Sequence, residues 1–462
     1  MTRTIQQGAD ELRAAMSGTV LVAGERGYDE ARRVLNADID RYPAVVARCA
    51  SATDVAAAVR YARAEGREIA VRGGAHSMSG QSTVDDGLVI DLSGMREVTV
   101  DPEARQVRVQ GGALLSDMNA ATQAHGLAVP AGIVGHTGVS GLTLGGGMGW
   151  LTRSCGLSID NLLGAEVVLA DGRIVQTSPA EHPDLCWALR GGGGNFGVVT
   201  EFRFRCHEVG PMIDFALFFW GLDQGAEAWR CMREVSATLP RGLTPILGAI
   251  NAPPAPFVPE ANQLQPGYAM MIAGFGSPEQ HAAAVEQVRA QCPPLVDLVT
   301  PMPFVALSEM FDEANAWGQY YYEKSVYVAE VTDEVIAAIT EQAPAKTSPL
   351  SIALLYRLDE SYCDVGEEDT AFSGGRTPRW ATFLVANTLD AASLPAERAW
   401  VRAFYEALRP LSLDDTAYVN AMTEDEPDRV RASYGPAKYA RLAAIKAEYD
   451  PDNAFHRNIN IR

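Results

Sequence analysis

The sequence predicts an α+β protein built from two domains. Its 462 residues exceed the roughly 250–300 residues that one hydrophobic core usually serves. Helix and strand patterns alternate up to about residue 210, whereas apolar and aromatic strand patterns dominate from there to about residue 410. A helical pattern returns at the C-terminal end. These changes in character predict three segments, 1–210, 211–410 and 411–462.

The first segment begins with a helix that leads into strands. A helix is expected over 51–66, because Ser51 and Asp54 form an N-terminal capping pattern and Gly66 ends the apolar stripe. The next run, EIAVR (68–72), has the composition of a short strand and leads directly into a glycine-rich loop. The remaining signals predict a helix over 114–126, strands over 87–92, 96–101, 105–110 and 197–209, and a hairpin over 164–178 that turns at Asp171-Gly172.

The second segment is richer in strands. The expected strands are MIDFALFFWG (212–221), YAMMIAGFG (268–276), KSVYVAEV (324–331), LSIALLYRL (350–358) and RWATFLVANT (379–388). Helices are expected over 279–291 and 332–342, and the proline-rich run 251–267 is expected to be a surface loop. The last fifty residues predict a helix over 434–450, followed by a short tail.

Composition excludes several classes of function. A net charge of −20 argues against binding nucleic acid or an anionic membrane surface, since both need basic patches. No apolar run reaches the roughly 18 residues that a membrane-spanning helix needs, and the N-terminus lacks secretory and transit patterns. The seven cysteines form no CxxC pair, so neither a metal site nor a disulfide framework is expected. We therefore expect a cytoplasmic protein, monomeric or homodimeric, whose partners are small molecules.

Three loops are unusually rich in glycine: 71–80, 130–150 and 190–199. Gly192, Gly194 and Gly197 match the GxGxxG spacing, but a helix pattern precedes them and a strand follows, which is the reverse of a Rossmann site. Glycine lets backbone N–H groups approach a ligand closely and form anion-binding concavities. Tight turns explain any one such loop, whereas three together favour a pyrophosphate held by backbone amides.

Five motifs occur along the chain in this order: VRGGAHSMSG, PAG followed by HTGVSGLTLGGGMGWL, GLSIDNLLGAEVVLADG, LRGGGGNFGVVTEF and YDPDNAFHRNINI. Together they resemble the berberine bridge enzyme-like FAD-linked oxidases, with a PCMH-type FAD-binding domain, in the vanillyl-alcohol oxidase superfamily. The resemblance covers essentially the whole chain. It implies that 1–210 and 411–462 form the FAD-binding domain. It also implies that 211–410 form a substrate domain, an antiparallel sheet flanked by helices.

The resemblance implies that FAD is bound covalently through His76. In this family the histidine of the RGGxHS-type motif is bonded to the flavin 8α-methyl group, and a neutral imidazole is a competent nucleophile. Val134 stands where doubly linked relatives have a cysteine, which predicts a single link. Cys155 is interpreted as a small buried hydrophobic residue. Ala75 departs from the glycine that many relatives carry.

Further FAD contacts follow from the same motifs. His136 is left open between a ring contact and a structural histidine. The residues expected to bind the cofactor are Arg72, Gly73, Gly74, Ala75, His76, Ser77, Met78, Gly80, Pro130, Gly132, His136, Thr137, Gly138, Gly141, Leu142, Gly145, Gly147, Asp160, Asn161, Gly192, Gly197, Val199, Asn458 and Asn460.

The catalytic base is not settled by the sequence. The family's YxNY segment often supplies a tyrosine from its second aromatic position, but here Ala421 stands there and only Tyr418 remains. A tyrosine needs a perturbing environment to act as a base near neutrality, since its ordinary pKa is about 10. Tyr418 is the candidate catalytic residue, and Tyr322, Tyr356 and Asp359 are expected to face the flavin as wall residues or as alternatives.

The implied activity is oxidation of a small organic molecule. Its hydride passes to flavin N5, and molecular oxygen reoxidises the flavin to give hydrogen peroxide. The aromatic runs FALFFW and WGQYYY, with Trp380, favour a planar secondary metabolite such as an alcohol, phenol, polyketide or alkaloid. Three alternatives remain open: a sugar oxidase of the same fold, a dehydrogenase with a non-oxygen acceptor, and a non-catalytic flavin- or ligand-binding protein.

Overall fold

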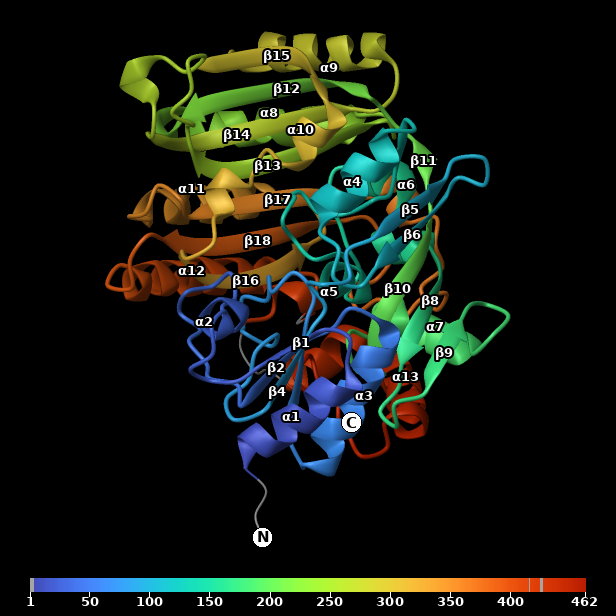
Figure 1. Cartoon of the computed structure of the whole chain (residues 1–462). Coiled ribbons are helices and arrows are strands. Elements are labelled where there is room, and N and C mark those ends of the chain that lie inside the picture. Colours follow the sequence, from blue (N-terminus) through green and yellow to red (C-terminus); the bar gives the residue numbers. More distant parts are fainter. Residues whose placement is uncertain (1–3, 415, 424–426) are drawn as a thin grey trace.

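The computed structural model describes residues 4–414, 416–423 and 427–462, and Figure 1 shows how its sheets are arranged. The first sheet consists of β1 (Thr19–Leu21), β2 (Val45–Arg48), β4 (Leu88–Asp91) and β3 (Ile69–Arg72), in that order. Its last three strands are parallel, and β1 is antiparallel at the edge. The helices α1 (Ile5–Ala15) and α3 (Ala52–Ala64) share a core with it, and the single turn α2 (Tyr28–Ala31) lies nearby.

The second sheet is antiparallel and has five strands. They are β5 (Val98–Asp101), β6 (Gln106–Gln110), β10 (Val198–Arg205), β8 (Leu162–Val168) and β9 (Ile174–Thr177), in that order. The helices of this region are α4 (Leu115–Gln123), α5 (Val139–Leu144), α6 (Thr152–Cys155) and α7 (Pro183–Leu189). A small ribbon pairs β7 (Leu127–Ala128) with β11 (His207–Glu208).

The C-terminal segment packs into the core of this second sheet. Helix α13 (Pro427–Tyr449), red in Figure 1, lies against α7, and its Leu442 and Ile445 are buried with the sheet residues. The helix is kinked at Gly435, where φ is 71°, and Pro436 follows. Residues more than 300 positions apart therefore share one core.

The third sheet has seven antiparallel strands. In spatial order they are β15 (Val296–Pro303), β12 (Met212–Gly221), β14 (Pro266–Gly274), β13 (Leu243–Asn251), β17 (Ile352–Leu358), β18 (Arg379–Thr388) and β16 (Tyr320–Val328). Four helices pack on one face: α8 (Gly225–Thr238), α9 (Pro278–Gln291), α11 (Asp333–Gln342) and α12 (Leu394–Leu408). The short helix α10 (Phe304–Ser308) follows β15.

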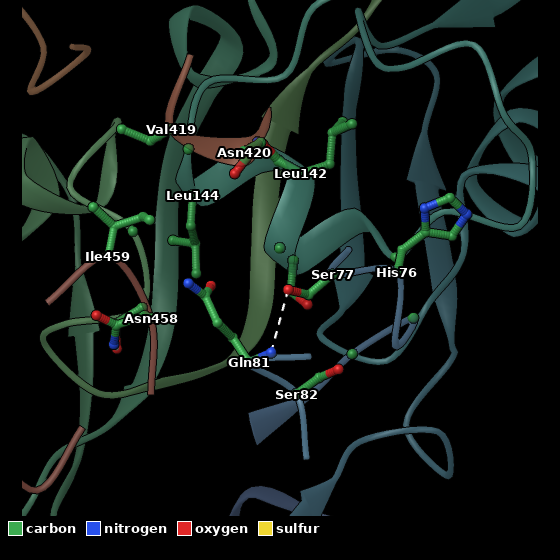
Figure 2. A pocket seen from close by; sticks show the side chains of 18 of the residues that line it. His76, Ser77, Gln81, Ser82, Leu142, Leu144, Val419, Asn420, Asn458 and Ile459 are labelled. Carbon is green, nitrogen blue, oxygen red and sulfur yellow. Dashed lines mark hydrogen bonds between the residues drawn. The ribbon is translucent and has the colours of Figure 1, made fainter. Parts of the chain in front are cut away.

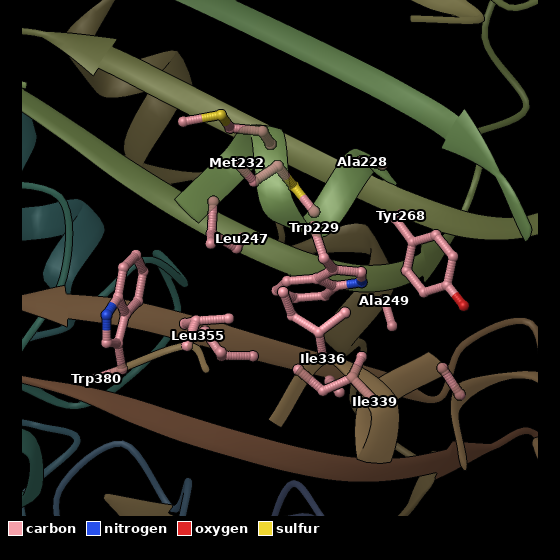
Figure 3. Packing of buried hydrophobic residues seen from close by; sticks show 14 of the residues in the cluster. Ala228, Trp229, Met232, Leu247, Ala249, Tyr268, Ile336, Ile339, Leu355 and Trp380 are labelled. Atoms are coloured by element: carbon pink, nitrogen blue, oxygen red, sulfur yellow. The ribbon is translucent and has the colours of Figure 1, made fainter. Parts of the chain in front are cut away.

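The α+β class with an antiparallel, helix-flanked sheet is confirmed, and the aromatic runs divide between the two faces of this sheet. Strand residues alternate between the two faces of a sheet. Phe218 and Trp220 therefore point toward the helices, whereas Phe215 and Phe219 face the opposite side. Figure 3 shows the helix-side core, in which Trp229 and Met232 of α8 and Ile336 and Ile339 of α11 pack near Leu247, Leu355 and Trp380. Tyr322, which was expected to face the flavin, is also part of this core, so Phe218, Trp220, Tyr322 and Trp380 pack against the helices.

Two buried ion pairs join the connection between β17 and β18 to helix α6 and the turn that follows it. Arg153 is fully buried and pairs with Asp359. Arg376 donates to Asp160 over 2.7 Å. Asp359 and Asp160 were expected at the flavin, but each carboxylate is instead committed to an arginine, which a buried charge requires. No helix in the described parts of the chain combines the length and apolarity needed to cross a bilayer.

Candidate active site

A cavity of about 360 Å³ lies where segments from all parts of the chain meet. The loop after β3 forms one side, and the loop around α5 and the turn before β10 form others. Strands β16, β17 and β18 and the C-terminal tail complete the wall. Figure 2 labels ten of the wall residues: His76, Ser77, Gln81, Ser82, Leu142, Leu144, Val419, Asn420, Asn458 and Ile459.

Backbone packing explains the paired glycines of the wall. A Cβ atom on Gly74 would lie 2.2 Å from the backbone nitrogen of Gly138, and one on Gly138 would lie equally close to the nitrogen of Gly74. Neither position therefore accepts a side chain. The next residue, Ala75, has a φ of 53°, a region that disfavours residues other than glycine, and its carbonyl accepts a hydrogen bond from Leu35. The loop that carries His76 is thus held by its backbone.

His76 belongs to the cavity wall and is hydrogen-bonded to a second histidine. Its Nε2 lies 3.0 Å from Nδ1 of His136 and 3.5 Å from Oγ1 of Thr137. Burial lowers the pKa of His76 to about 3, and the neighbouring His136 acts in the same direction. The imidazole is therefore neutral at physiological pH, the form in which one ring nitrogen carries a free lone pair.

Several buried polar atoms of the wall find no partner among the described residues. They are Oγ of Ser82, Nε of Arg457 and Oδ1 of Asn458. Leaving such groups unpaired costs about 1–3 kcal/mol each, so they indicate a ligand that supplies the missing partners. FAD fits this set, because its pyrophosphate accepts hydrogen bonds and its ring system both donates and accepts them. Arg457 was missed in the sequence, although it lies inside the C-terminal motif.

One part of the cavity wall, called the apolar end below, is aromatic. Tyr356, Phe383 and Tyr418 line it, and Phe383 packs edge-on against both tyrosines. The hydroxyl oxygen of Tyr418 accepts hydrogen bonds from the backbone N–H of Gly147 (3.0 Å) and from Nδ2 of Asn420 (2.8 Å). Burial raises the pKa of Tyr418 to about 12. The two accepted hydrogen bonds act in the opposite direction, because they favour the phenolate, but burial has the larger effect. The phenol therefore keeps its proton and can donate it into the cavity.

Glu323 on β16 adds a carboxyl group to this apolar end. Its side chain belongs to the cavity wall and is buried, and burial raises its pKa to about 8. Tyr356 and Tyr418 belong to the same cavity wall, and the charge of Glu323 adds to the effect of burial in raising their pKa values. The sequence did not single out Glu323, because it stands in the run YYYEKSVYV with no motif around it. Strand alternation with buried neighbours is the signal that identifies it.

Sixteen of the predicted site residues lie on the cavity wall. Most come from the glycine-rich loops, and Tyr418 is the candidate catalytic residue among them. They are Gly73, Gly74, Ala75, His76, Ser77, Met78, Gly132, Thr137, Gly138, Gly141, Leu142, Gly145, Gly197, Val199, Tyr418 and Asn458.

Nine predicted residues lie outside the wall, and several of them have hydrogen-bond partners within the protein. The guanidinium of Arg72 donates to the carbonyl of Ala31, and Asn161 donates to two backbone carbonyls of its own turn. The carbonyl of Pro130 accepts from Ser158. The nine residues are Arg72, Gly80, Pro130, His136, Gly147, Asp160, Asn161, Gly192 and Asn460. Their expected contact with the cofactor therefore stays a prediction that the cavity wall does not support.

Comparison with known proteins agrees with this geometry. Residues 43–178 match the family model described as FAD binding domain, and residues 417–462 match the model described as berberine and berberine like. (R)-6-hydroxynicotine oxidase of Paenarthrobacter nicotinovorans is 29% identical, over 97% of each chain. The chain carries the FAD-binding and the berberine-like domains of FAD-linked oxidoreductases.

Solved structures match this oxidoreductase over nearly its full length. The 6-hydroxy-D-nicotine oxidase of Arthrobacter nicotinovorans superimposes with a TM-score of 0.85 at 26% identity, covering 97% of this chain and 98% of that one. Glucooligosaccharide oxidase from Acremonium strictum, whose FAD is described as 6-S-cysteinyl and 8α-N1-histidyl, gives a TM-score of 0.85 at 24% identity, covering 100% and 99%. The vanillyl-alcohol oxidase-like two-domain fold is therefore confirmed.

Gly141 offers a direct test of where FAD binds. It lies on the cavity wall, and a Cβ atom added there meets nothing within 4 Å. We expect Gly141→Leu to leave the fold intact and to purify with little or no FAD, and Gly141→Ala to lose less. Flavin absorbance per protein and the melting temperature of the flavin-depleted protein measure the two effects. Full FAD content in the leucine variant would show that the cofactor does not occupy this part of the cavity.

Proposed function

We propose that this oxidoreductase is an oxidase of a small organic molecule with an apolar or aromatic body, and that its FAD is linked covalently to His76. The observation that carries the proposal is the composition of the cavity wall. Glycine loops and His76 form its cofactor side, and Tyr356, Phe383, Tyr418 and Glu323 form its other end. FAD supplies the hydride acceptor when bound, and dioxygen is the proposed final acceptor.

The residues at the apolar end have complementary roles in this proposal. Glu323 accepts the proton of a substrate O–H or N–H group, since its raised pKa makes it a base that works near neutral pH. Tyr418 orients the substrate by donating its O–H, because its own oxygen already accepts two hydrogen bonds. Tyr356 and Phe383 pack against the apolar body of the substrate.

An apolar wall favours a ring-bearing substrate over a sugar. A sugar would need several hydrogen-bonding partners to replace its water, and the wall at this end presents aromatic and aliphatic groups such as Phe383 and Met422. Among the relatives, (R)-6-hydroxynicotine oxidase is named for a ring-bearing amine, and glucooligosaccharide oxidase is named for a sugar. We therefore place alcohols, phenols and alkaloids before sugars.

An anaerobic absorbance screen tests the proposal. The holoenzyme is mixed with alcohols, phenols, cyclic amines and oligosaccharides, and bleaching of the flavin band identifies the substrate. Admitting air should restore the band within one turnover and release one hydrogen peroxide per substrate. Slow recovery in air with rapid recovery on a quinone would instead identify a dehydrogenase. Binding of a ligand without bleaching would identify a non-catalytic flavoprotein.

A further inference from the structure

The contact between His76 and His136 leaves one nitrogen of each ring to be assigned. Nε2 of His76 and Nδ1 of His136 are 3.0 Å apart, so one of the two carries the shared hydrogen and the other accepts it. The wall geometry does not by itself choose between them. The choice matters, because it decides which nitrogen of His76 has a free lone pair.

The second ring nitrogen of His136, Nε2, decides between the two assignments. Its Nε2 faces the backbone carbonyl of Asp312 at 3.5 Å, and a carbonyl oxygen can only accept. Nε2 of a neutral His136 therefore carries the hydrogen, and its Nδ1 is the acceptor. Nε2 of His76 must then be the donor, which leaves the lone pair on Nδ1 of His76.

The loop that carries His136 is fixed independently of the cofactor. The carboxylate of Asp312 accepts a hydrogen bond of 2.6 Å from the backbone N–H of Gly135, the residue before His136. Asp312 follows α10, which belongs to the middle segment of the chain. The same residue thus holds the loop with its side chain and orients the imidazole with its carbonyl. His136 lies off the cavity wall, behind His76, so it can act only through His76.

We propose that His136 is a positioning residue for covalent attachment of FAD: it holds His76 with the lone pair on Nδ1 and receives the Nε2 hydrogen as a proton when Nδ1 bonds to the 8α carbon. This inference rests on the covalent link of the proposed function. In the net reaction one N–C bond forms. One hydrogen leaves the 8α-methyl group, and the Nε2 proton of His76 stays on Nδ1 of His136, which becomes an imidazolium. Dioxygen takes up the two electrons, the 8α hydrogen and one proton from solvent, and leaves as hydrogen peroxide. After attachment, Nε2 of His76 carries the lone pair and His136 becomes the donor, so the hydrogen bond survives with its direction reversed.

The test compares substitutions at His136 in the full chain by following acid-stable flavin over time after FAD is added. His136→Phe keeps a ring but removes the acceptor, and we expect covalent attachment to slow by about 10²-fold, the lower range for loss of a general base. His136→Asn keeps an acceptor near the Nδ1 position and should recover to within about tenfold of the wild type. His125→Phe, the same change at an exposed histidine, is the matched control and should attach FAD at the wild-type rate.

Flavin fluorescence quenching measures non-covalent FAD binding in the same samples, and the binding should be equal in all of them. A wild-type attachment rate in His136→Phe would overturn the role of His136 while leaving the covalent link in place. A wild type without any acid-stable flavin would overturn both.

A measurement on the wild type does not depend on any variant folding. Proteolysis and hydrolysis of the holoenzyme release a histidyl flavin, which is compared by chromatography with authentic Nδ1- and Nε2-linked standards. We expect attachment through Nδ1. Attachment through Nε2 would overturn the inference, because that nitrogen would have to leave His136 to react.

Discussion

Glu323→Gln is expected to slow reduction of the flavin by substrate by about 10²–10⁴-fold, the range for loss of a general base. The amide has the size of the carboxyl group but cannot accept a proton. FAD content should not change, because Glu323 belongs to strand β16 and not to the glycine-rich loops. Stopped-flow absorbance under anaerobic conditions measures the rate directly, with the substrate found by the screen.

The pH dependence of the same rate provides a second measure. A base acts in its ionised form, and burial raises the pKa of Glu323 to about 8. The rate of reduction should therefore rise with pH up to about 8 and level off above it. Tyr356 and Tyr418 are the titratable groups that face Glu323, and burial raises the pKa of each well beyond this range. The rise should be absent in the glutamine variant.

Tyr418→Phe is the matched comparison for Glu323→Gln. Loss of an orienting hydrogen bond should cost about tenfold, whereas loss of the proton acceptor costs far more. If the tyrosine variant shows the larger loss and the glutamine variant reduces its flavin at nearly the wild-type rate, the roles are reversed and the phenol takes the proton.

Stability offers a test of Glu323 that needs no substrate. Its pKa is raised in the folded protein relative to the ordinary value of 4.5, so the folded state binds the proton more tightly than the unfolded state does. Its contribution to the free energy of unfolding is fully present below about pH 4.5 and is lost as pH rises toward 8. Glu323→Gln should therefore gain melting temperature relative to the wild type between pH 5 and pH 8. If the difference in melting temperature between the variant and the wild type is the same at pH 5 and pH 8, Glu323 is ionised over this whole range.

His76→Ala is expected to abolish covalent attachment of FAD completely. Acid-precipitated wild-type protein should remain yellow, and a proteolytic peptide that contains His76 should carry the flavin mass. The alanine variant should still fold and bind FAD, because the glycine loops and Asn458 remain, but it should release all of it on precipitation.

Cys155→Ser is the control for a second link. Cys155 lies off the cavity wall, and burial raises the pKa of its thiol to about 11, so it is not a nucleophile toward the cofactor. Its substitution should leave the acid-stable flavin unchanged. Acid-stable flavin in His76→Ala would show a link at another residue, and free flavin in the wild-type supernatant would refute the covalent link itself.

Local patterns predicted most of the regular structure. The helix over 51–66 and the hairpin that turns at Asp171-Gly172 are confirmed as α3 and the β8–β9 pair. Both carry their own signals, a capping residue in the first and a turn dipeptide in the second. Helices α8 and α12 and strands β13 and β15 were not predicted. α8 begins without a side-chain cap, and the exposed edge strand β15 alternates without a strong apolar face.

The sequence by itself determined the family, the FAD-binding loops and the candidate linking histidine, because glycine spacing and motif order are local properties of the chain. Only the tertiary structure decided which side chains face the cavity. Glu323 and Tyr356 lie on different strands, and whether they meet depends on the register of β16 and β17 against β18. His136, Asp160 and Arg72 likewise form hydrogen bonds with residues that lie 40 or more positions away in the sequence. A buried charge or ring nitrogen takes whatever partner the packed chain brings within hydrogen-bond distance, and the local sequence does not specify that partner.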